Sequence, residues 1–211
     1  MPTGHYFDAS PGAPSRPSQV ELRLPDAVAS LTVDRGVFSG TRVDPGTVAL
    51  LRAETVVAPA GHLLDLGCGY GPIACTLARR APGATVWAVD VNQRALALTR
   101  ANAASLGLTN LVAADPDGVP GDVSFAEIWS NPPIRIGKEA LHELLDGWLA
   151  RLVPEGRALL VVHRHLGGDS LADWLTGAGW VVARRASKQG YRVLEARRQR
   201  LSKRQRLSEP Q

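Results

Sequence analysis

The sequence predicts an α/β protein: a Rossmann-like, doubly wound and mostly parallel sheet of seven strands, with one antiparallel strand near the C-terminus and short N-terminal strands. Two observations predict this fold. From residue 61 onward, short apolar runs alternate with longer amphipathic stretches, as strands and helices do in such proteins. Most of the short runs are apolar throughout, which is typical of parallel strands that helices cover on both faces.

The length and composition indicate one full-sized domain with tails. The chain has 211 residues, of which 45% are hydrophobic and 21% charged, as in an ordinary soluble globular protein. No apolar run approaches the roughly 20 residues that span a membrane, and the N-terminus lacks the blocks of a signal peptide. We therefore expect a cytoplasmic protein without a membrane partner. Cys68 and Cys75, the only cysteines, are not spaced as a metal clip, so no metal is expected.

The N-terminal quarter is expected to hold little regular structure. Residues 1–18 should form an extended arm, because four prolines exclude a helix or a central strand there. Short strands are expected at Val20–Leu24 and Ser30–Val33. A helix is expected at Val48–Val57, with Thr47 as its N-cap.

The alternating part follows. The expected strands are Leu63–Leu66, Thr85–Val89, Leu111–Ala114, Phe125–Trp129 and Ala158–Val162. The expected helices are Pro72–Arg80, Asn92–Leu106, Lys138–Leu152 and Ser170–Thr176. Pro72 suits a first helical turn, where a missing N–H costs little, and Gly107 suits a helix end.

The C-terminal part is expected to end in a hairpin and a tail. Trp180–Ala183 and Tyr191–Glu195 should pair around Gly190, which supplies the antiparallel strand. The domain would then span residues 19–196. Within residues 197–211, the segment Arg197–Arg206 carries six basic residues and no acid, so we expect a flexible basic tail there.

The segment Asp65–Pro72 is a glycine-rich turn between the first strand of the alternating part and its helix. In doubly wound sheets, ligands bind beyond such strand ends. Gly67, Gly69 and Gly71 would let the backbone approach a ligand closely. A dinucleotide fingerprint has the spacing G-x-G-x-x-G, whereas this turn reads G-x-G-x-G and has Pro72 at the next position. The pattern therefore favours another nucleotide-like cofactor.

The tetrapeptide Asn131-Pro132-Pro133-Ile134 follows another strand end. The Asn131 side-chain oxygen and the Pro132 backbone oxygen can accept both N–H bonds of a planar amine and aim its lone pair, while the prolines lock φ. With the glycine turn, this indicates methyl transfer from S-adenosylmethionine to nitrogen, helped mainly by alignment. The alternative is that Asn-Pro-Pro only ends a strand with a tight turn.

Four carboxylates are further candidates for binding this cofactor. Asp90 ends the second strand and can accept from the ribose hydroxyls, or it can add charge to a helix N-terminus. Asp115 ends the third strand and can accept from an adenine amino group, although its Asp-Pro-Asp-Gly setting also makes a turn. Asp65 and Asp44 are candidates for holding the methionine end, or for capping backbone N–H groups.

These motifs resemble those of class I S-adenosylmethionine-dependent methyltransferases. More narrowly, the chain resembles the methyltransferase small domain family, which includes bacterial 16S and 23S ribosomal RNA guanine-N2 methyltransferases. The segments that extend the resemblance are His5-Tyr6-Phe7, Gly36–Ser39, Asp44–Thr47, Asn131–Lys138 and Gly190–Leu194. The ribosomal enzymes carry a second, degenerate copy of the domain for RNA binding, which these 211 residues do not contain.

The resemblance implies the site residues. The cofactor-binding residues that it implies are Asp44, Thr47, Asp65, Gly67, Cys68, Gly69, Gly71, Asp90, Val91, Asp115 and Asn131. The catalytic residues are Asn131 and Pro132, and the substrate-binding residues are Pro133, Ile134, Arg135 and Lys138. Ile134 is a departure, because many amino-methyltransferases carry Tyr or Phe there to stack on the base. Tyr6, Phe7 and Phe38 are candidates to replace that stacking on an unpaired or flipped base.

We expect an RNA partner, ribosomal RNA or a ribosomal subunit. The formal charge of +4 is compatible with it, and Arg135, Lys138 and Arg164 could meet phosphates. His163 or His165 could accept a proton. The expected reaction is N-methylation of an exocyclic base amine of RNA, guanine N2 of ribosomal RNA. The alternatives are adenine N6, a protein glutamine, a small-molecule amine, or a silent cofactor- or RNA-binding module; the intact Asn-Pro-Pro argues against the last.

Overall fold

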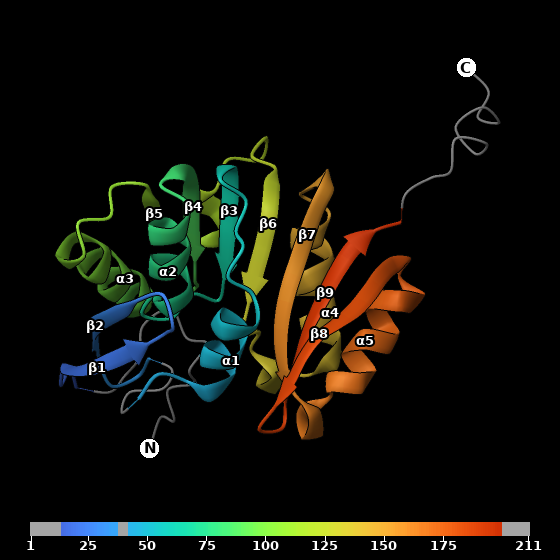
Figure 1. The fold of residues 1–211 in the computed structure, drawn as a ribbon, viewed down its shortest axis with the longest axis horizontal. Helices are drawn as coiled ribbons and strands as arrows, with labels where there is room; N and C mark the ends of the chain where they lie inside the picture. The colour runs from blue at the N-terminus through green and yellow to red at the C-terminus, as the bar shows by residue number, and fades with distance from the viewer. Residues whose placement is uncertain (1–13, 38–41, 200–211) are drawn as a thin grey trace.

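A computed structural model describes residues 14–37 and 42–199 of the chain. Its main sheet has seven strands in the order β5-β4-β3-β6-β7-β9-β8 (Figure 1). The strands are β3 (Ala60–Leu66), β4 (Gly83–Val89), β5 (Leu111–Ala114), β6 (Phe125–Ser130), β7 (Leu152–His163), β8 (Trp180–Lys188) and β9 (Tyr191–Arg198). Only β9 runs antiparallel to its neighbours. The predicted fold class is therefore confirmed, with the switch in strand order between β3 and β6.

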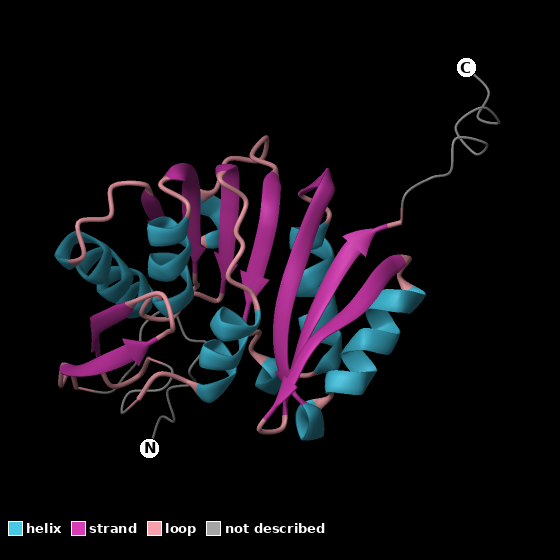
Figure 2. Cartoon of the chain, viewed as in Figure 1, coloured by secondary structure: helices cyan, strands magenta, loops and turns pink. Residues whose placement is uncertain are grey.

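Helices cover both faces of this sheet (Figure 2). The helices are α1 (Pro45–Ala53), α2 (Pro72–Arg80), α3 (Gln93–Ser105), α4 (Lys138–Leu149) and α5 (Gly168–Gly177). Successive strand residues point to opposite faces. Leu63 therefore packs in the core under α1, α2 and α3, and Leu64 in the core under α4 and α5. The same alternation in β7 explains why these strands are apolar at every position.

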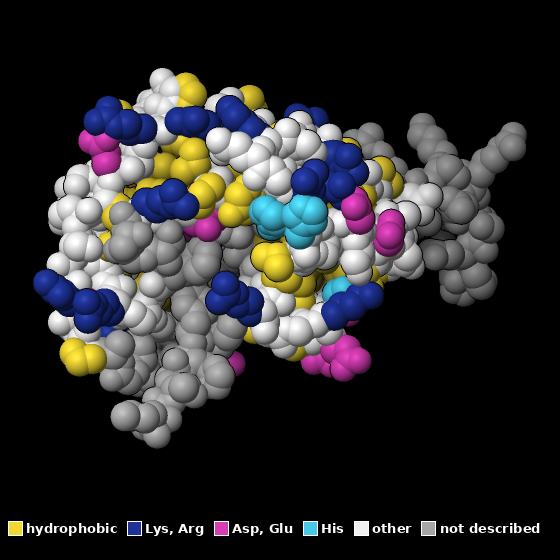
Figure 3. Space-filling view, turned by 90° about the horizontal axis from the view of Figure 1, so that it is seen from below, with side chains coloured by type: hydrophobic (Ala, Val, Ile, Leu, Met, Phe, Trp, Pro, Cys, Tyr) yellow, Lys and Arg dark blue, Asp and Glu magenta, His cyan; other side chains and the backbone are white. Residues whose placement is uncertain are grey.

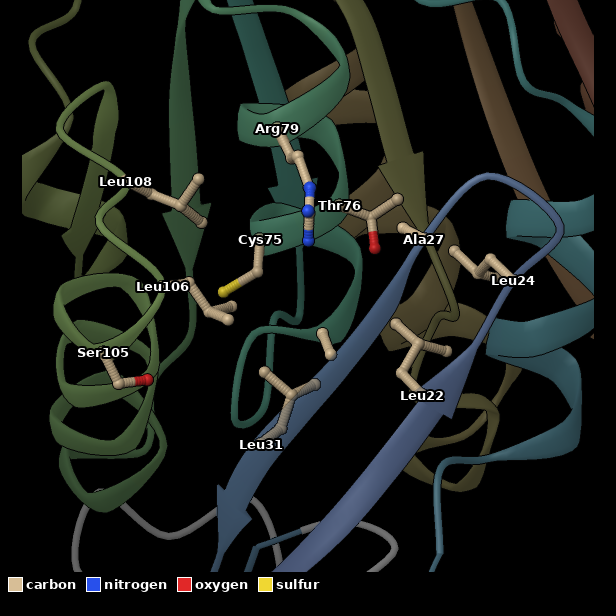
Figure 4. Close-up of a pocket in the computed structure, with 11 residues that line it drawn as sticks. Leu22, Leu24, Ala27, Leu31, Cys75, Thr76, Arg79, Ser105, Leu106 and Leu108 are labelled. Atoms are coloured by element: carbon tan, nitrogen blue, oxygen red, sulfur yellow. The ribbon is translucent and has the colours of Figure 1, made fainter.

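A separate hairpin of β1 (Ser18–Arg23) and β2 (Val28–Val33) lies against α2 and α3. It borders a cavity of about 360 Å³, lined by Leu22 and Leu31 of the hairpin and by Cys75 and Arg79 of α2 (Figure 4). None of the residues predicted to bind cofactor or acceptor lines this cavity. The cavity is thus separate from the predicted site, but the end of β2 lies near the carboxyl edge of the sheet, because Asn102 donates both to Thr32 O and to Tyr70 O of the glycine turn.

The start of α1 differs from the prediction. The helix begins at Pro45 and its N-cap is Asp44, whose side chain accepts from the backbone N–H groups of Gly46 and Thr47. Thr47 as N-cap was therefore wrong. Proline presets the helical φ at a first position, and aspartate is among the best N-cap residues, so Asp44-Pro45 is the stronger start signal.

The end of α4 also differs, because the helix stops at Leu149 and β7 begins at Leu152. The strand continues through Pro154, a residue that is usually excluded from a central strand. The register explains this: Phe125 pairs with Leu152 and Glu127 with Arg157, so extra residues of β7 bulge out between the two pairs. A bulge tolerates a proline that a regular central strand would exclude.

The C-terminal hairpin is confirmed. Gln189 and Gly190 both have positive φ, 51° and 83°, as the two central residues of a type I′ turn require. Strand β9 runs on to Arg198 because Arg197 pairs with Val181 and Arg157. The first two residues of the expected tail are therefore part of the sheet, and residues 200–211 lie outside the described residues, as do residues 1–13 of the expected arm.

Candidate active site

The glycine turn follows β3 at the carboxyl edge of the sheet. Its three glycines have φ values of +75° (Gly67), +56° (Gly69) and +88° (Gly71), a region that favours glycine. The amides of Gly67 and Cys68 donate to the carbonyl oxygen of Val89 at 2.8 and 3.0 Å, which fastens the turn to the end of β4. A side chain added at Gly69 would meet nothing within 4 Å, so the middle of the turn is open.

Gly71 has no room for a side chain. An added methyl group would lie 2.9 Å from Thr99 Oγ1 and Cγ2, in a left-handed backbone conformation. We therefore expect Gly71→Ala to lower the free energy of unfolding by about 1–3 kcal/mol, measured by urea denaturation. The matched control is Gly147→Ala in α4, where nothing lies within 4 Å; it should raise stability by about 0.5–1 kcal/mol. Equal effects of the two substitutions would contradict this account of Gly71.

Asp90 joins the turn to α3. Its Oδ2 accepts from Gly69 N and its Oδ1 from Asn92 N, both at 2.9 Å, and burial raises its pKa. The neighbouring Val91 is 44% exposed and offers an apolar surface beside the strand end. Asp115, at the end of β5, is exposed and accepts from Gly118 N at 2.8 Å. The three residues thus follow neighbouring strands β4 and β5, as the sequence predicted.

Asp65 is buried at the end of β3, and one of its oxygens has no partner. Its Oδ2 accepts from Ala74 N in the first turn of α2 at 2.8 Å. Its Oδ1 and the hydroxyl of Tyr70 are buried and make no hydrogen bond with the described residues. Burial raises the pKa of Asp65 to about 8. A buried carboxyl oxygen without a partner is costly. This position therefore fits a ligand with a cationic N–H donor, such as the ammonium of S-adenosylmethionine, whose charge would also favour the ionised form of Asp65.

The raised pKa of Asp65 gives a pH prediction. The folded protein holds this proton up to about pH 8, whereas an ordinary aspartate releases it near 3.8. Stability should therefore fall as pH rises between these two values and level off above the higher one. Asp65→Asn keeps an oxygen for Ala74 N and removes the titration. Urea denaturation at about pH 5 and about pH 9 should show a gain in stability over the original protein that grows with pH; a constant difference would refute the assignment.

The Asn-Pro-Pro segment lies beside the glycine turn. It follows β6, whose last residue, Ser130, donates its hydroxyl to the carbonyl oxygen of Leu66 at 2.7 Å. A side chain added at Gly67 would lie 4.0 Å from Cδ of Pro133. Parallel strands end at the same edge of a sheet, which is why two motifs more than 60 residues apart in sequence become neighbours.

The Asn131 amide is held at its nitrogen. Its Nδ2 donates to Asp44 Oδ1 at 2.8 Å and to Thr47 Oγ1 at 3.2 Å. No described residue donates to Asn131 Oδ1. A carboxylate can only accept, so the NH₂ end of the amide must face Asp44. The oxygen is therefore the end that is available to another group.

The Pro132 carbonyl has one of its two lone pairs in use. It accepts from Ile134 N at 2.8 Å, and Pro133 has φ −75° and ψ 73°, the values of an inverse γ-turn. The other lone pair can accept a second donor. Ile134 is half-buried and packs on the core under α4 and α5, while Arg135 and Lys138 are exposed.

An aromatic and basic rim borders the site. Tyr191, the first residue of β9, meets His163 edge-on with ring centroids 5.0 Å apart, and a side chain at Gly46 would collide with the Tyr191 ring at 2.7 Å. Arg164 Nε donates to His165 Nε2 at 2.9 Å. Figure 3 views the molecule from below, with histidine side chains near the middle of the face and Lys and Arg side chains spread around it.

Sequence reasoning missed several residues that shape the site. Thr99 donates to the Gly69 carbonyl at 2.9 Å and lies 3.7 Å from the Cys68 thiol, so only the backbone of Cys68 can face a ligand. Tyr191 was noted only as part of the last strand. Thr99 and Tyr191 look in the sequence like ordinary helix and strand residues, and only their contacts reveal the role. Tyr6, Phe7 and Phe38, the candidates for base stacking, lie outside the described residues.

Two negative findings concern residues 14–37 and 42–199. No three His, Cys, Asp or Glu side chains come together there in a way that could hold a metal ion. No helix in the described part of the chain has the length and apolar character needed to cross a membrane.

Comparison with known proteins gives a consistent match. The family model for the methyltransferase small domain matches residues 29–195. The uncharacterized protein YbxB of Bacillus subtilis is 32% identical over 92% of this chain and 98% of its own length. Ribosomal RNA small subunit methyltransferase C of Pseudomonas entomophila is 33% identical over 92% of this chain, but only 58% of that protein is covered.

The solved structures agree with this. The Thermus thermophilus 16S rRNA N2 G1207 methyltransferase, RsmC, in complex with AdoMet and guanosine, superimposes with a TM-score of 0.76 and 26% identity. The match covers 88% of this chain and 52% of that one. The chain thus spans nearly all of the Bacillus relative and just over half the length of the ribosomal RNA enzymes that it matches.

Proposed function

Because the chain belongs to the methyltransferase small domain family, and so to the S-adenosylmethionine-dependent methyltransferases, we propose that it methylates an exocyclic base amine of RNA, guanine N2 of ribosomal RNA. One observation carries the proposal. The Asn131 amide stands beside the glycine turn with both N–H bonds engaged, and none of the described residues donates to its oxygen. That oxygen is an acceptor aimed by the protein and suited to an amine.

The glycine turn and the nearby carboxylates would hold the cofactor. When bound, S-adenosylmethionine supplies an electrophilic methyl group on its sulfonium sulfur. Asp65 would bind its ammonium group through the oxygen that has no partner among the described residues. Asp90 would accept from the ribose hydroxyls with its remaining lone pairs, and Val91 and Asp115 would contact the adenine. The positive φ values of the turn support a close approach of backbone and ligand.

Asn131 and Pro132 would prepare the amine. The lone pair of an exocyclic base amine is delocalised into the ring, so the nitrogen is a weak nucleophile. Two acceptors on its N–H bonds draw it toward sp³ geometry and aim the lone pair. The side-chain oxygen of Asn131 and the second lone pair of the Pro132 carbonyl supply them. The remaining rate enhancement would come mainly from alignment of the amine nitrogen with the methyl group.

Residues that follow β6 and β7 at the carboxyl edge of the sheet would hold the RNA. Pro133 and Ile134 offer apolar contact to the base, and Arg135, Lys138 and Arg164 offer charge to phosphates. Two similar proteins support a ribosomal RNA substrate. One is the Pseudomonas ribosomal RNA methyltransferase, and the other is the Thermus 16S rRNA methyltransferase, whose structure holds guanosine. Such a substrate would place the protein in the cytoplasm. We propose residues 19–196 as the methyltransferase domain, flanked by an arm and a basic tail.

Labelling of the methyl group tests which molecule and which atom the protein methylates. Tritiated methyl transfer to ribosomal RNA from a strain lacking the gene, followed by nucleoside mass spectrometry, should give N2-methylguanosine. N6-methyladenosine would move the target to adenine, and label on protein alone would replace RNA with a protein acceptor. No binding of S-adenosylmethionine by calorimetry at about millimolar concentration would leave only a silent module.

A further inference from the structure

Asn131 is held by two residues at the start of α1, the N-cap Asp44 and Thr47. Its Nδ2 donates to Asp44 and to Thr47 across 87 and 84 residues of sequence. We propose that Asp44, helped by Thr47, is a positioning residue for methyl transfer, which sets the direction of the Asn131 amide. This inference rests on the proposed function, because it takes Asn131 as the acceptor for the amine.

The argument begins with the two ends of an amide. The oxygen and nitrogen of an asparagine side chain have nearly the same shape, and rotation by 180° exchanges them at little steric cost. Flipped, Asn131 would present N–H donors to the N–H bonds of the amine. Such an arrangement cannot draw the nitrogen toward sp³ geometry. Turnover therefore requires a contact that excludes the flipped form of the Asn131 amide, whereas the stability of the fold does not.

Asp44 excludes the flipped form by charge and by acceptor count. Its carboxylate would face the amide oxygen in that form, with two acceptors at about hydrogen-bond distance and no proton between them. In the observed form, each of the two N–H bonds of Asn131 has an acceptor, at 2.8 Å on Asp44 and at 3.2 Å on Thr47. Both amide hydrogens are used, so the amide oxygen is left to accept from the amine that is to be methylated.

Asp44 is itself held in place by its neighbours. Asp44 Oδ1 also accepts from Gly46 N at 2.8 Å and from Thr47 N at 3.1 Å, so three donors converge on one oxygen. The Tyr191 ring closes the other side, since a side chain at Gly46 would lie 2.7 Å from that ring. The start of α1 thus forms a rigid support for the Asn131 amide, and Asp44 has a role there beyond the cofactor contact that the sequence predicted for it.

Substitutions at the two residues test the kinetic consequence. Asp44→Ala should lower kcat about 10–100-fold at saturating RNA, while the Kd of S-adenosylmethionine changes less than about threefold. Asp44→Asn keeps an oxygen for all three donors and should restore at least about a third of the original kcat. Thr47→Val should lower kcat about 3–10-fold, and Thr47→Ser, which keeps the hydroxyl, should not follow it. Thermal unfolding of each variant separates loss of the helix cap from loss of turnover.

A readout independent of turnover is the Asn131 side-chain amide in a ¹H–¹⁵N spectrum, identified by its absence in Asn131→Ala. Both protons should exchange slowly with water in the original protein and in Asp44→Asn, and fast in Asp44→Ala. Fast exchange in the original protein would overturn the proposal, as would an Asp44→Ala variant that binds cofactor poorly but keeps kcat. If no RNA is methylated and the amide is still protected, the proposed function fails and the positioning contact stands.

Discussion

Replacing Asn131 by alanine is expected to lower kcat about 10²–10³-fold, the cost of losing one preorganised hydrogen-bonding group at a reacting centre. The variant should still bind S-adenosylmethionine within about threefold of the original Kd, because the glycine turn, Asp65 and Asp90 are untouched. Single-turnover methyl transfer to the RNA acceptor measures the first quantity and calorimetry the second. A loss confined to kcat means that the amide acts in the transition state.

Two further variants sharpen the Asn131 result. Asn131→Asp keeps the shape, but it sets a second carboxylate against Asp44 Oδ1, which lies 2.8 Å from Asn131 Nδ2, so it should not rescue turnover near neutral pH. The matched control is Asn110→Ala. The Asn110 side chain donates to the carbonyls of Ala78, Ala81 and Ala84, so its loss should lower stability and leave kcat intact below the unfolding temperature. Full turnover by Asn131→Ala would remove the central step of the proposed reaction.

The neighbourhood of the two motifs could be predicted from the sequence. The apolar runs identify parallel strands, and parallel strands end at one edge of the sheet. Gly67 and Pro133 therefore had to approach each other, as they do. The helix after the turn was equally predictable, because Pro72 gives a strong start signal and α2 begins there.

The partners of the individual side chains could not be predicted in the same way. Asp44, read from the sequence, is a helix cap or a ligand contact, and nothing local points to an amide 87 residues away. Pro154 looks like a barrier to a strand until the bulge opposite Phe125 is seen. Contacts of this kind depend on register and on the packing of side chains, which local propensities do not contain.

A buried cluster of charges is the clearest case. Arg157 of β7 donates to Glu127 at 2.9 Å, to Glu54 at 3.0 Å and to Glu195 at 3.2 Å, and to the Val56 carbonyl at 2.6 Å. In sequence these residues look like surface charges, because charged side chains are seldom buried. The carboxylates raise the pKa of Arg157, and the arginines nearby lower that of Glu195.

Arg157→Ala should lower the free energy of unfolding by about 3–5 kcal/mol. The substitution leaves the buried carboxylates without their shared cation and the Val56 carbonyl without its donor. Arg197 and Arg157 together hold the pKa of Glu195 below its ordinary 4.5, so the part of the stability that comes from Arg157 and Glu195 is present above that pH and is lost as pH falls. The deficit of the variant should therefore shrink toward about pH 4, as urea denaturation across pH would show.

The matched control for Arg157 is Arg197→Ala. The Arg197 side chain pairs with the same Glu195 at 2.8 Å, but it is 46% exposed. An exposed pair contributes less than about 1 kcal/mol because water competes for both charges. If burial decides the cost, the two arginines should differ several-fold although they share a partner. Equal losses would contradict the role of burial, and a deficit of Arg157→Ala that does not shrink on acidification would contradict the ion pairs as its source.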